Sequence, residues 1–143
     1  MTSEVANRKL GFLIDYLNEL KRFEGMNDGE YFPQRFAVER IMQLLVEVAN
    51  DLLTHLLKDR FNVICRGYKD SFTKAANNKL ISRDLGARLE KHGGFRNLLV
   101  HQYGEYSPEQ VYMEIKPFID NFSEFIRQVR GGVYITNSTD EHG

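Results

Sequence analysis

The sequence predicts an all-α fold, an antiparallel helical bundle of two long helices, several shorter helices and a long C-terminal helix. Apolar residues recur at spacings of three and four along three segments, which is the period of a helix with one buried face. The length of 143 residues suits one domain, and 42% hydrophobic with 27% charged residues is typical of a globular chain. Apolar runs are far shorter than the about 20 residues of a membrane-spanning helix, so we expect no membrane contact.

The first helix is expected over about residues 3–24, before the polar stretch at residues 25–29. Thr2 or Ser3 can cap its start, because a hydroxyl accepts a hydrogen bond from a free backbone N–H group. Its apolar stripe consists of Val5, Leu10, Leu13, Ile14, Leu17 and Leu20.

The second helix is expected over residues 31–58, with Pro33 in its first turn, where the missing N–H is tolerated. The apolar stripe of this helix is unusually wide. It consists of Val38, Ile41, Leu45, Val48, Leu52 and Leu56, and is broadened by Phe36, Met42, Ala49 and Leu53. Such a stripe can cover both an intramolecular core and a partner helix. This helix is therefore our first candidate for a homodimer surface.

The middle of the chain predicts a loop over residues 59–70 and then three short helices, at about 71–77, 83–91 and 95–103. Gly93-Gly94 should separate the last two, because glycine readily takes the left-handed conformation that ends a helix. The first two helices have serine caps, which are Ser71 and Ser82.

The last helix begins at a strong start signal, Ser107-Pro108-Glu109-Gln110, in which serine caps, proline takes the first helical position and glutamine completes a capping box. Pro117 should kink it. Gly131-Gly132 should end it, which predicts a helical domain at 1–130 and a short mobile tail at 131–143. Its buried face consists of Val111, Ile115, Phe118, Ile119, Phe122, Phe125, Ile126 and Val129.

Composition narrows the function classes. The net charge is -1, from 19 basic and 20 acidic residues, so the chain lacks the basic excess of proteins that coat nucleic acid. Any contact with RNA needs a local basic patch or a partner. The single cysteine, Cys65, excludes an internal disulfide and suits a reducing cytoplasm. The N-terminus does not read as a secretory signal, so we expect a cytoplasmic protein.

Arg96 and His101 carry the clearest chemistry, with Tyr103 two residues beyond. Five helical steps turn the chain by roughly 500°, so the two side chains should point about 140° apart. They converge only if the helix ends near His101, as Gly104 indicates, or if the long arginine swings round. Spacing alone equally fits a surface arginine, a capping or core histidine and a half-buried tyrosine.

These residue types suit RNA cleavage. The ribose 2′-hydroxyl is a built-in nucleophile, and a histidine that titrates near neutrality can take its proton or protonate the leaving 5′-oxygen. An arginine can bind the phosphate through two N–H groups and stabilise its extra negative charge. Tyr103 can orient the phosphate or the histidine by hydrogen bonding. The chemistry needs no cofactor, and we predict no metal site.

The segment Gly94-Phe95-Arg96-Asn97-Leu98-Leu99-Val100-His101-Gln102-Tyr103 resembles the R-x4-H-x-Y signature of HEPN domains, in the form found in HepT-type toxins. The flanking segments 85–89 and 107–112 fit the same family, as do the helix at 31–58 and Ser71-Phe72. The resemblance covers about residues 3–130.

The resemblance implies a homodimeric, metal-independent endoribonuclease that acts as the toxin of a toxin–antitoxin pair. It implies that motif residues of both protomers meet in a cleft at the dimer interface, with Arg96 on the phosphate and His101 as acid or base. The implied partner is a minimal nucleotidyltransferase antitoxin of the MntA type, which can transfer AMP to the motif tyrosine, here Tyr103. Dimerisation also fits the chemistry, because one chain supplies one motif histidine and a two-fold axis supplies the second.

Further charged residues are weaker candidates. Arg83, Arg88 and Lys91 can form a basic lip for RNA with Arg96, or simply a solvated helix face offset by neighbouring acids. Glu47 and Asp51 are spaced so that they can hold a cation or order a motif arginine, although such a pair is more often solvated surface.

A second function class stays open beside the ribonuclease. It is a non-catalytic HEPN subunit that binds a nucleotidyltransferase partner and nucleotide, which the near-neutral charge favours and the intact Arg96/His101/Tyr103 set opposes. A purely structural bundle would leave Arg96 and His101 facing no cavity.

Overall fold

The computed structural model describes residues 4–102 and 104–142, and of residues 132–142 only the backbone. Every regular element in this described part is helical, which confirms the predicted all-α fold. None of its helices has both the length and the apolar character that crossing a bilayer requires. The elements are α1 (Glu4–Lys21), α2 (Asp28–Tyr31), η1 (Phe32–Gln34), α3 (Arg35–Phe61), α4 (Tyr68–Asn77), α5 (Arg83–His101) and α6 (Pro108–His142).

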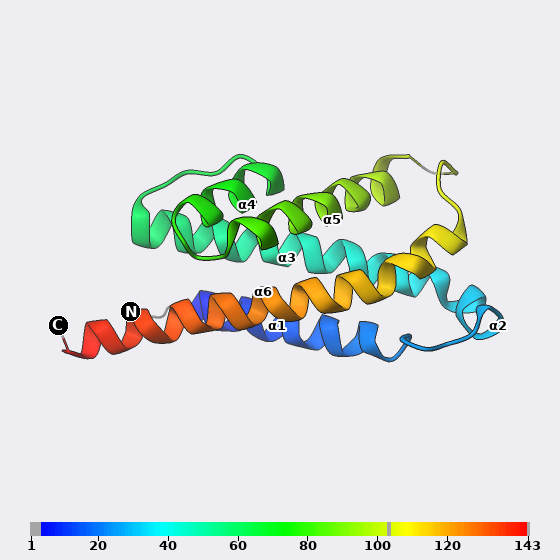
Figure 1. Cartoon of the computed structure of the whole chain (residues 1–143), viewed down its shortest axis with the longest axis horizontal. Helices are drawn as coiled ribbons and strands as arrows, with labels where there is room; N and C mark the ends of the chain where they lie inside the picture. The colour runs from blue at the N-terminus through cyan, green and yellow to red at the C-terminus, as the bar shows by residue number, and fades with distance from the viewer. Residues whose placement is uncertain (1–3, 103, 143) are drawn as a thin grey trace.

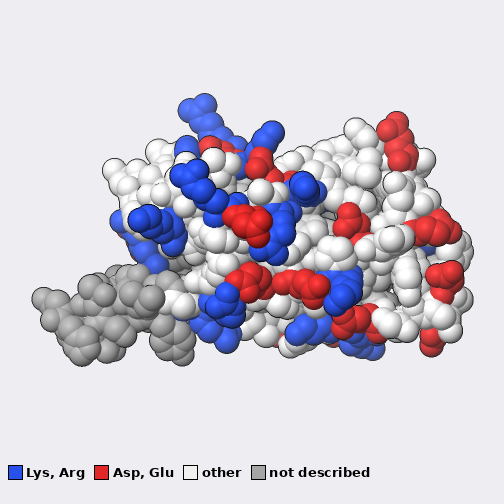
Figure 2. Space-filling model, in the orientation of Figure 1, with Lys and Arg blue, Asp and Glu red and all other residues white. Residues whose placement is uncertain are grey.

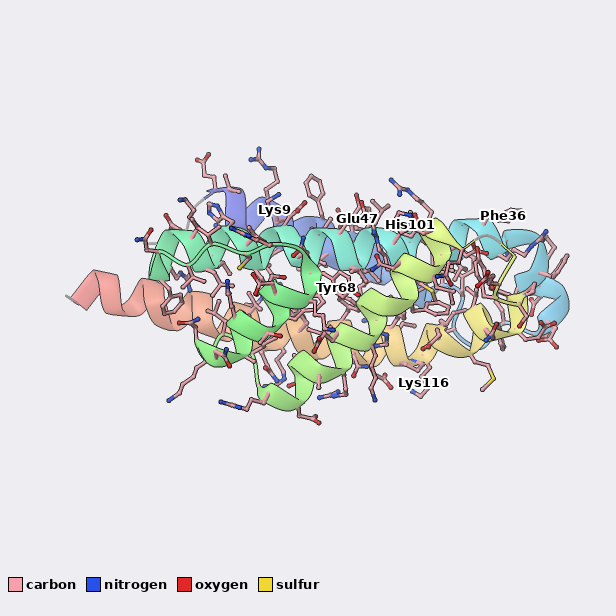
Figure 3. All side chains as sticks on the ribbon, turned by 90° about the horizontal axis from the view of Figure 1, so that it is seen from above. Lys9, Phe36, Glu47, Tyr68, His101 and Lys116 are labelled. Carbon is pink, nitrogen blue, oxygen red and sulfur yellow. The ribbon has the colours of Figure 1, made fainter. Side chains whose placement is uncertain are left out.

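Helix α3 is the centre of the bundle. It contacts α1, α4, α5 and α6, with α1 and α6 on one side and α4 and α5 on the other (Figure 1). The long helices α1 and α3 run antiparallel, as predicted, whereas α6 runs parallel to α3 and antiparallel to α1 (Figure 1). Seen from above, α5 runs obliquely across the bundle, over α3 and α6 (Figure 3). The C-terminal turns of α5, which carry the motif, therefore lie over the first half of α3.

The core follows the predicted stripes. Leu13 and Leu20 of α1, Leu45 and Leu52 of α3 and Phe118 of α6 are fully buried. Each such side chain contributes about 1.5–3 kcal/mol when it leaves water, so this interior stabilises the bundle far more than local helix signals do. The end of α1 is followed by turns, and its predicted caps Thr2 and Ser3 lie outside the described residues.

Two predicted helix starts are confirmed. The Ser82 hydroxyl accepts a hydrogen bond from the Leu85 N–H at 3.1 Å. At the start of α6, the Ser107 hydroxyl accepts from the Gln110 N–H at 3.2 Å, and Ser107 N–H donates back to Gln110 Oε1 at 2.7 Å. This reciprocal box fixes the chain directly after the motif.

The predicted helix at 31–58 is wrong at its start. Asn27 and Glu30 form a capping box of their own, with bonds of 2.9 and 3.0 Å, so helical structure begins with α2 at Asp28. Pro33 then lies in the 3-10 turn η1, and the long helix begins only at Arg35. It also continues past the predicted end, to Phe61, where Asn62 takes a left-handed conformation with φ 54°.

The prediction that Ser71 caps a helix is wrong. Helix α4 starts earlier, at Tyr68, and Ser71 is buried inside it. Its hydroxyl donates to Asn50 Oδ1 of α3 at 2.6 Å, so tertiary contact and not capping uses this serine.

Gly93-Gly94 does not interrupt a helix either. Helix α5 is continuous from Arg83 to His101. The ring of Tyr68 packs directly onto the backbone at Gly93, where a β-carbon would overlap it. Glycine serves here as a place of close approach between α4 and α5, a use that a sequence signal cannot separate from a helix stop.

The predicted helix end at Gly131-Gly132 is also wrong, because α6 runs to His142. Glycine permits a left-handed residue without requiring one: Gly25, Gly67 and Gly104 take positive φ, whereas Gly131 stays helical. The secondary structure therefore crosses the predicted boundary at residue 130. The division into a domain at 1–130 and a mobile tail at 131–143 stays a prediction.

Candidate functional site

Arg96 lies on the side of α5 that faces α3, with 24% of its side chain exposed. Its Nη2 stands 3.4 Å from Glu47 Oε2 of α3. Its Nη1 donates to Asn97 Oδ1 at 3.0 Å. Its Nε is buried and has no hydrogen-bond partner among the described residues. The guanidinium is therefore held on two sides, and the donors left for an anion are the second N–H groups of Nη1 and Nη2.

Asn97 connects Arg96 to a third helix. Its Nδ2 donates to the Tyr68 hydroxyl of α4 at 3.3 Å. Tyr68 is in turn seated on Gly93, one turn of α5 earlier. Glu47 of α3 thus contacts the guanidinium of Arg96 directly, and Tyr68 of α4 is linked to it through Asn97.

His101 is exposed and is the last residue of α5. It lines an open hollow of about 470 Å³ between α5 and α6. The other lining residues are Lys91, Gly94, Phe95, Asn97, Leu98, Gln102 and Glu114. Burial raises the pKa of Glu114 above its ordinary value, which places a second proton-exchanging group in the hollow.

Arg96 and His101 do not share one lining within the protomer. The hollow that His101 lines does not include Arg96, which turns toward α3 instead. This agrees with the angle of about 140° expected from helical geometry. The third motif residue, Tyr103, lies outside the described residues, as part of the link between α5 and α6. That link is fastened to α3 by the Tyr106 hydroxyl, which donates to Glu39 Oε1 at 2.7 Å.

The predicted basic lip is not one cluster. Lys91 lines the His101 hollow, whereas Arg83 lines a different pocket at the start of α5. Arg88 is 40% exposed at its side chain and is paired at both terminal nitrogens: one lies 2.8 Å from Asp84, and the other donates to Asn121 Oδ1 of α6. Their roles in RNA binding stay predictions, with Arg88 the least accessible of the three.

His92 shows what a structural histidine looks like in this fold. It is 5% exposed, packs 4.2 Å from the Phe118 ring centroid and lies 2.7 Å from Asn121 Nδ2. Burial, reinforced by the charge of Arg88 and opposed by a hydrogen bond to the Pro117 carbonyl, lowers its pKa to about 4. His92 is therefore neutral at physiological pH and belongs to the core.

The two acidic residues of α3 have different neighbours. Glu47 is paired with the motif arginine, while Asp51 stands 4.0 Å from Lys9 of α1. Among the residues that the structure describes, no three His, Cys, Asp or Glu side chains gather where they could hold a metal ion. Cys65 is half-buried, and burial raises the pKa of its thiol.

Charge is unevenly spread over the molecule. Figure 2 shows Lys and Arg side chains gathered toward the end where α4 and α5 meet, while acidic side chains predominate at the opposite end, over α2 and the start of α6. A pocket of about 570 Å³ at the basic end is lined by Lys79, Arg83 and Arg127. Basic side chains are therefore concentrated at one end of the molecule although the net charge of the chain is -1.

Sequence reasoning missed two of the residues around the motif arginine. Asn97 stands inside the motif, but nothing in its spacing shows that its amide bridges Arg96 and Tyr68. The sequence predicts a loop at Tyr68 and a helix end at its partner Gly93. A glycine inside an otherwise continuous helical pattern was the available signal for such a close approach.

Comparison with known proteins places this site in a family. Residues 13–129 match the model of the "Ribonuclease HepT-like" family. The match covers most of the chain and includes the whole motif, so the chain belongs to the ribonuclease HepT-like family. This confirms the resemblance drawn from the motif and the prediction of an endoribonuclease.

Individual relatives agree with the family. The chain is 27% identical over 128 residues to a tRNA nuclease HepT of Aphanizomenon flos-aquae, covering 87% of each chain. It is 29% identical over 116 residues to an mRNA nuclease HepT of Shewanella oneidensis, covering 78% of this chain and 87% of the relative.

Solved structures confirm the HEPN-like fold. A tri-AMPylated HEPN toxin of Shewanella oneidensis in complex with an MNT antitoxin matches with a TM-score of 0.78 and 26% identity, over 91% of this chain and 99% of that one. A toxin–antitoxin structure with AMP-PNP matches with a TM-score of 0.78 and 25% identity, over 90% and 99%.

Proposed function

We propose that this chain is the toxin of a toxin–antitoxin pair and that it cleaves RNA without a metal ion. The ribose 2′-oxygen attacks the adjacent phosphorus, the bond to the 5′-oxygen breaks, and the products end in a 2′,3′-cyclic phosphate and a 5′-hydroxyl. His101 takes the 2′-proton or protonates the leaving oxygen. Arg96 binds the phosphate and stabilises the charge that develops on it.

The observation that carries this proposal is the placement of Arg96 and His101 in a family of ribonucleases. Both lie in the last turns of α5 and both reach the surface: Arg96 with 24% of its side chain exposed, and His101 in an open hollow. A purely structural bundle predicts that the motif histidine faces no cavity, whereas His101 lines one and the other α5 histidine, His92, is buried.

A cleft between two protomers completes the site in this proposal. Arg96 and His101 face different sides of α5, and each chain supplies one motif histidine. A two-fold axis beside the end of α5 would bring the motif residues of one protomer to those of its partner, so that one histidine acts as base and the other as acid.

The proposed partner is a nucleotidyltransferase antitoxin of the MntA type, which AMPylates Tyr103. Support comes from the similar Shewanella toxin, which is AMPylated and bound to an MNT antitoxin. Incubation with an MNT-class enzyme and ATP should place AMP on Tyr103 by mass spectrometry, and Tyr103→Phe should remain unmodified. AMP on another residue alone would refute this part.

The ribonuclease itself is tested by adding purified protein to total bacterial RNA with EDTA present. Wild type should cleave and leave 2′,3′-cyclic phosphate ends, and His101→Ala should be slower by about 10²- to 10⁴-fold. Expression without a partner in the bacterial cytoplasm should be toxic for wild type only. Equal harmlessness of both forms with no cleavage would favour the non-catalytic subunit, and 5′-phosphate ends would exclude the proposed chemistry.

A further inference from the structure

We infer that Glu47 of α3 and Tyr68 of α4 are positioning residues for Arg96, and that together they hold its guanidinium in the orientation that phosphate binding requires. The inference rests on the proposed role of Arg96 in the ribonuclease reaction. It assigns functional roles to two residues outside the R-x4-H-x-Y motif.

The first half of the argument is the contact with α3. Arg96 Nη2 stands 3.4 Å from Glu47 Oε2, and the same oxygen stands 3.9 Å from Arg40 Nη1. Glu47 is 37% exposed, so solvent screens its charge and the pair contributes little to folding stability. Its geometric effect is larger, because a long flexible side chain loses most of its freedom once one end of its fork is held.

The second half is the contact with α4. Asn97 Oδ1 accepts from Arg96 Nη1 at 3.0 Å, which requires its amide to point Oδ1 toward the arginine. The Tyr68 hydroxyl accepts from Asn97 Nδ2 at 3.3 Å and so fixes that orientation. Tyr68 is itself located by its packing on Gly93. Glu47 of α3 thus holds one terminal nitrogen of Arg96 directly, and Tyr68 of α4 acts on the other through Asn97.

The second N–H groups of Nη1 and Nη2 are what the contacts with Asn97 and Glu47 leave for the substrate, since the Nε of Arg96 is buried. A guanidinium binds phosphate best through a pair of parallel N–H groups, and that geometry is lost if the plane rotates. Fixing the plane before RNA arrives lowers the reorganisation needed in the transition state.

Glu47→Gln gives the sharpest test, because electrostatics alone predicts equal or tighter RNA binding without a loss of rate, whereas a positioning role predicts a lower kcat. Removing a carboxylate beside the site should attract polyanionic RNA more strongly, so KM should hold or fall. Loss of positioning should nevertheless lower kcat by about tenfold, within the usual range of coupling between contacting residues. Tyr68→Phe should lower kcat by about threefold, as expected for one lost hydrogen bond.

The matched controls are Asp51→Asn and Tyr112→Phe. Asp51 is one turn further along α3 and pairs with Lys9, so its variant removes an ion pair without touching Arg96. The Tyr112 hydroxyl bonds to the Met26 carbonyl away from the motif. Both should keep wild-type kcat and KM. Thermal unfolding of all variants should show that each is folded.

A double-mutant cycle separates this inference from the proposed function. Initial rates are measured on the full-length protein over a range of total bacterial RNA concentrations, in wild-type and Arg96→Lys backgrounds. If Glu47 acts through Arg96, Glu47→Gln should cause no further loss in the Arg96→Lys protein.

Each outcome decides the matter. A wild-type kcat for Glu47→Gln, or the same tenfold loss in both backgrounds, overturns the positioning role while the ribonuclease proposal stands. A wild-type kcat for Arg96→Lys itself overturns the role of Arg96 in the proposed function, and the positioning role with it.

Discussion

Helix α5 carries two histidines whose surroundings could hardly differ more. His92 faces α6, where Phe118, Phe122 and Asn121 enclose it, and its pKa is lowered to about 4. His101 ends the same helix, exposed in an open hollow beside Lys91 and Glu114. The residue type is the same, so the difference lies entirely in what the fold places around each ring.

The two arginines of α5 contact different helices. Arg88 donates to Asn121 of α6, whose amide also contacts His92, so this arginine ties α5 to α6 although 40% of its side chain is exposed. Arg96 turns to the side of α3, where Glu47 and Asn97 contact its two terminal nitrogens. The first half of α5 therefore carries the buried contacts with α6, and its last turns carry the candidate site.

The largest expected effect comes from changing each histidine to glutamine. His101→Gln should lower the cleavage rate by about 10²- to 10⁴-fold and leave the free energy of unfolding within about 0.5 kcal/mol of wild type. His92→Gln should keep kcat per folded molecule and lose about 1–3 kcal/mol of stability, because buried partners lose their bonds. Urea unfolding measures the stability of both variants, and RNA cleavage measures their rates. A large stability loss in His101→Gln together with a large rate loss in His92→Gln would contradict the comparison.

Acid should destabilise the fold through His92 on the α6 side of α5. The pKa of His92 is about 4 in the folded chain against an ordinary 6.5, so between these values the unfolded chain binds the extra proton. Stability from this group is complete above about pH 6.5 and is lost as the pH falls to about 4, by roughly 3 kcal/mol. Comparing urea unfolding of wild type and His92→Gln over this range isolates the effect. Parallel pH profiles would mean that His92 is not held neutral.

The neighbouring glycines of α5 offer a smaller and more local test. Gly93→Ala should destabilise the protein by about 1–2 kcal/mol, because the new methyl group overlaps the Tyr68 ring and forces it to move. Gly94→Ala has open space around its β-carbon and should stabilise the helix by up to about 1 kcal/mol. Thermal unfolding of both variants makes the comparison, and equal shifts would contradict the close packing at Gly93.

The smallest effect is expected at the start of α6, directly after the motif. Ser107→Ala removes the cap of the box with Gln110 and should cost about 1 kcal/mol. Ser123→Ala, in the interior of the same helix, is the matched control and should cost nothing. If both variants unfold at the wild-type temperature, the box does not fix the connection after the motif.

Much of the fold was predictable because its signals are local. The apolar stripes of α1, α3 and α6 and the caps at Ser82 and Ser107 follow from periodicity and backbone hydrogen bonding, which depend only on neighbouring residues. The errors came where one residue type has two uses. Ser71 and Gly93 have the chemistry of a cap and of a stop, but Asn50 and Tyr68, distant in sequence, give them a packing role instead.

The same division holds for the site. Sequence by itself determined the all-helical class, the motif residues Arg96, His101 and Tyr103 and the chemistry that an arginine and a histidine can offer to RNA, since these depend on residue type and spacing. Only the tertiary structure decided that His92 belongs to the core, that Arg88 contacts Asn121, that Lys91 lies with His101, and that Glu47 and Asn97 contact Arg96. The physical reason is that burial, pKa and hydrogen-bond partnership are set by helices that meet in space, and their contacts have no fixed distance along the chain.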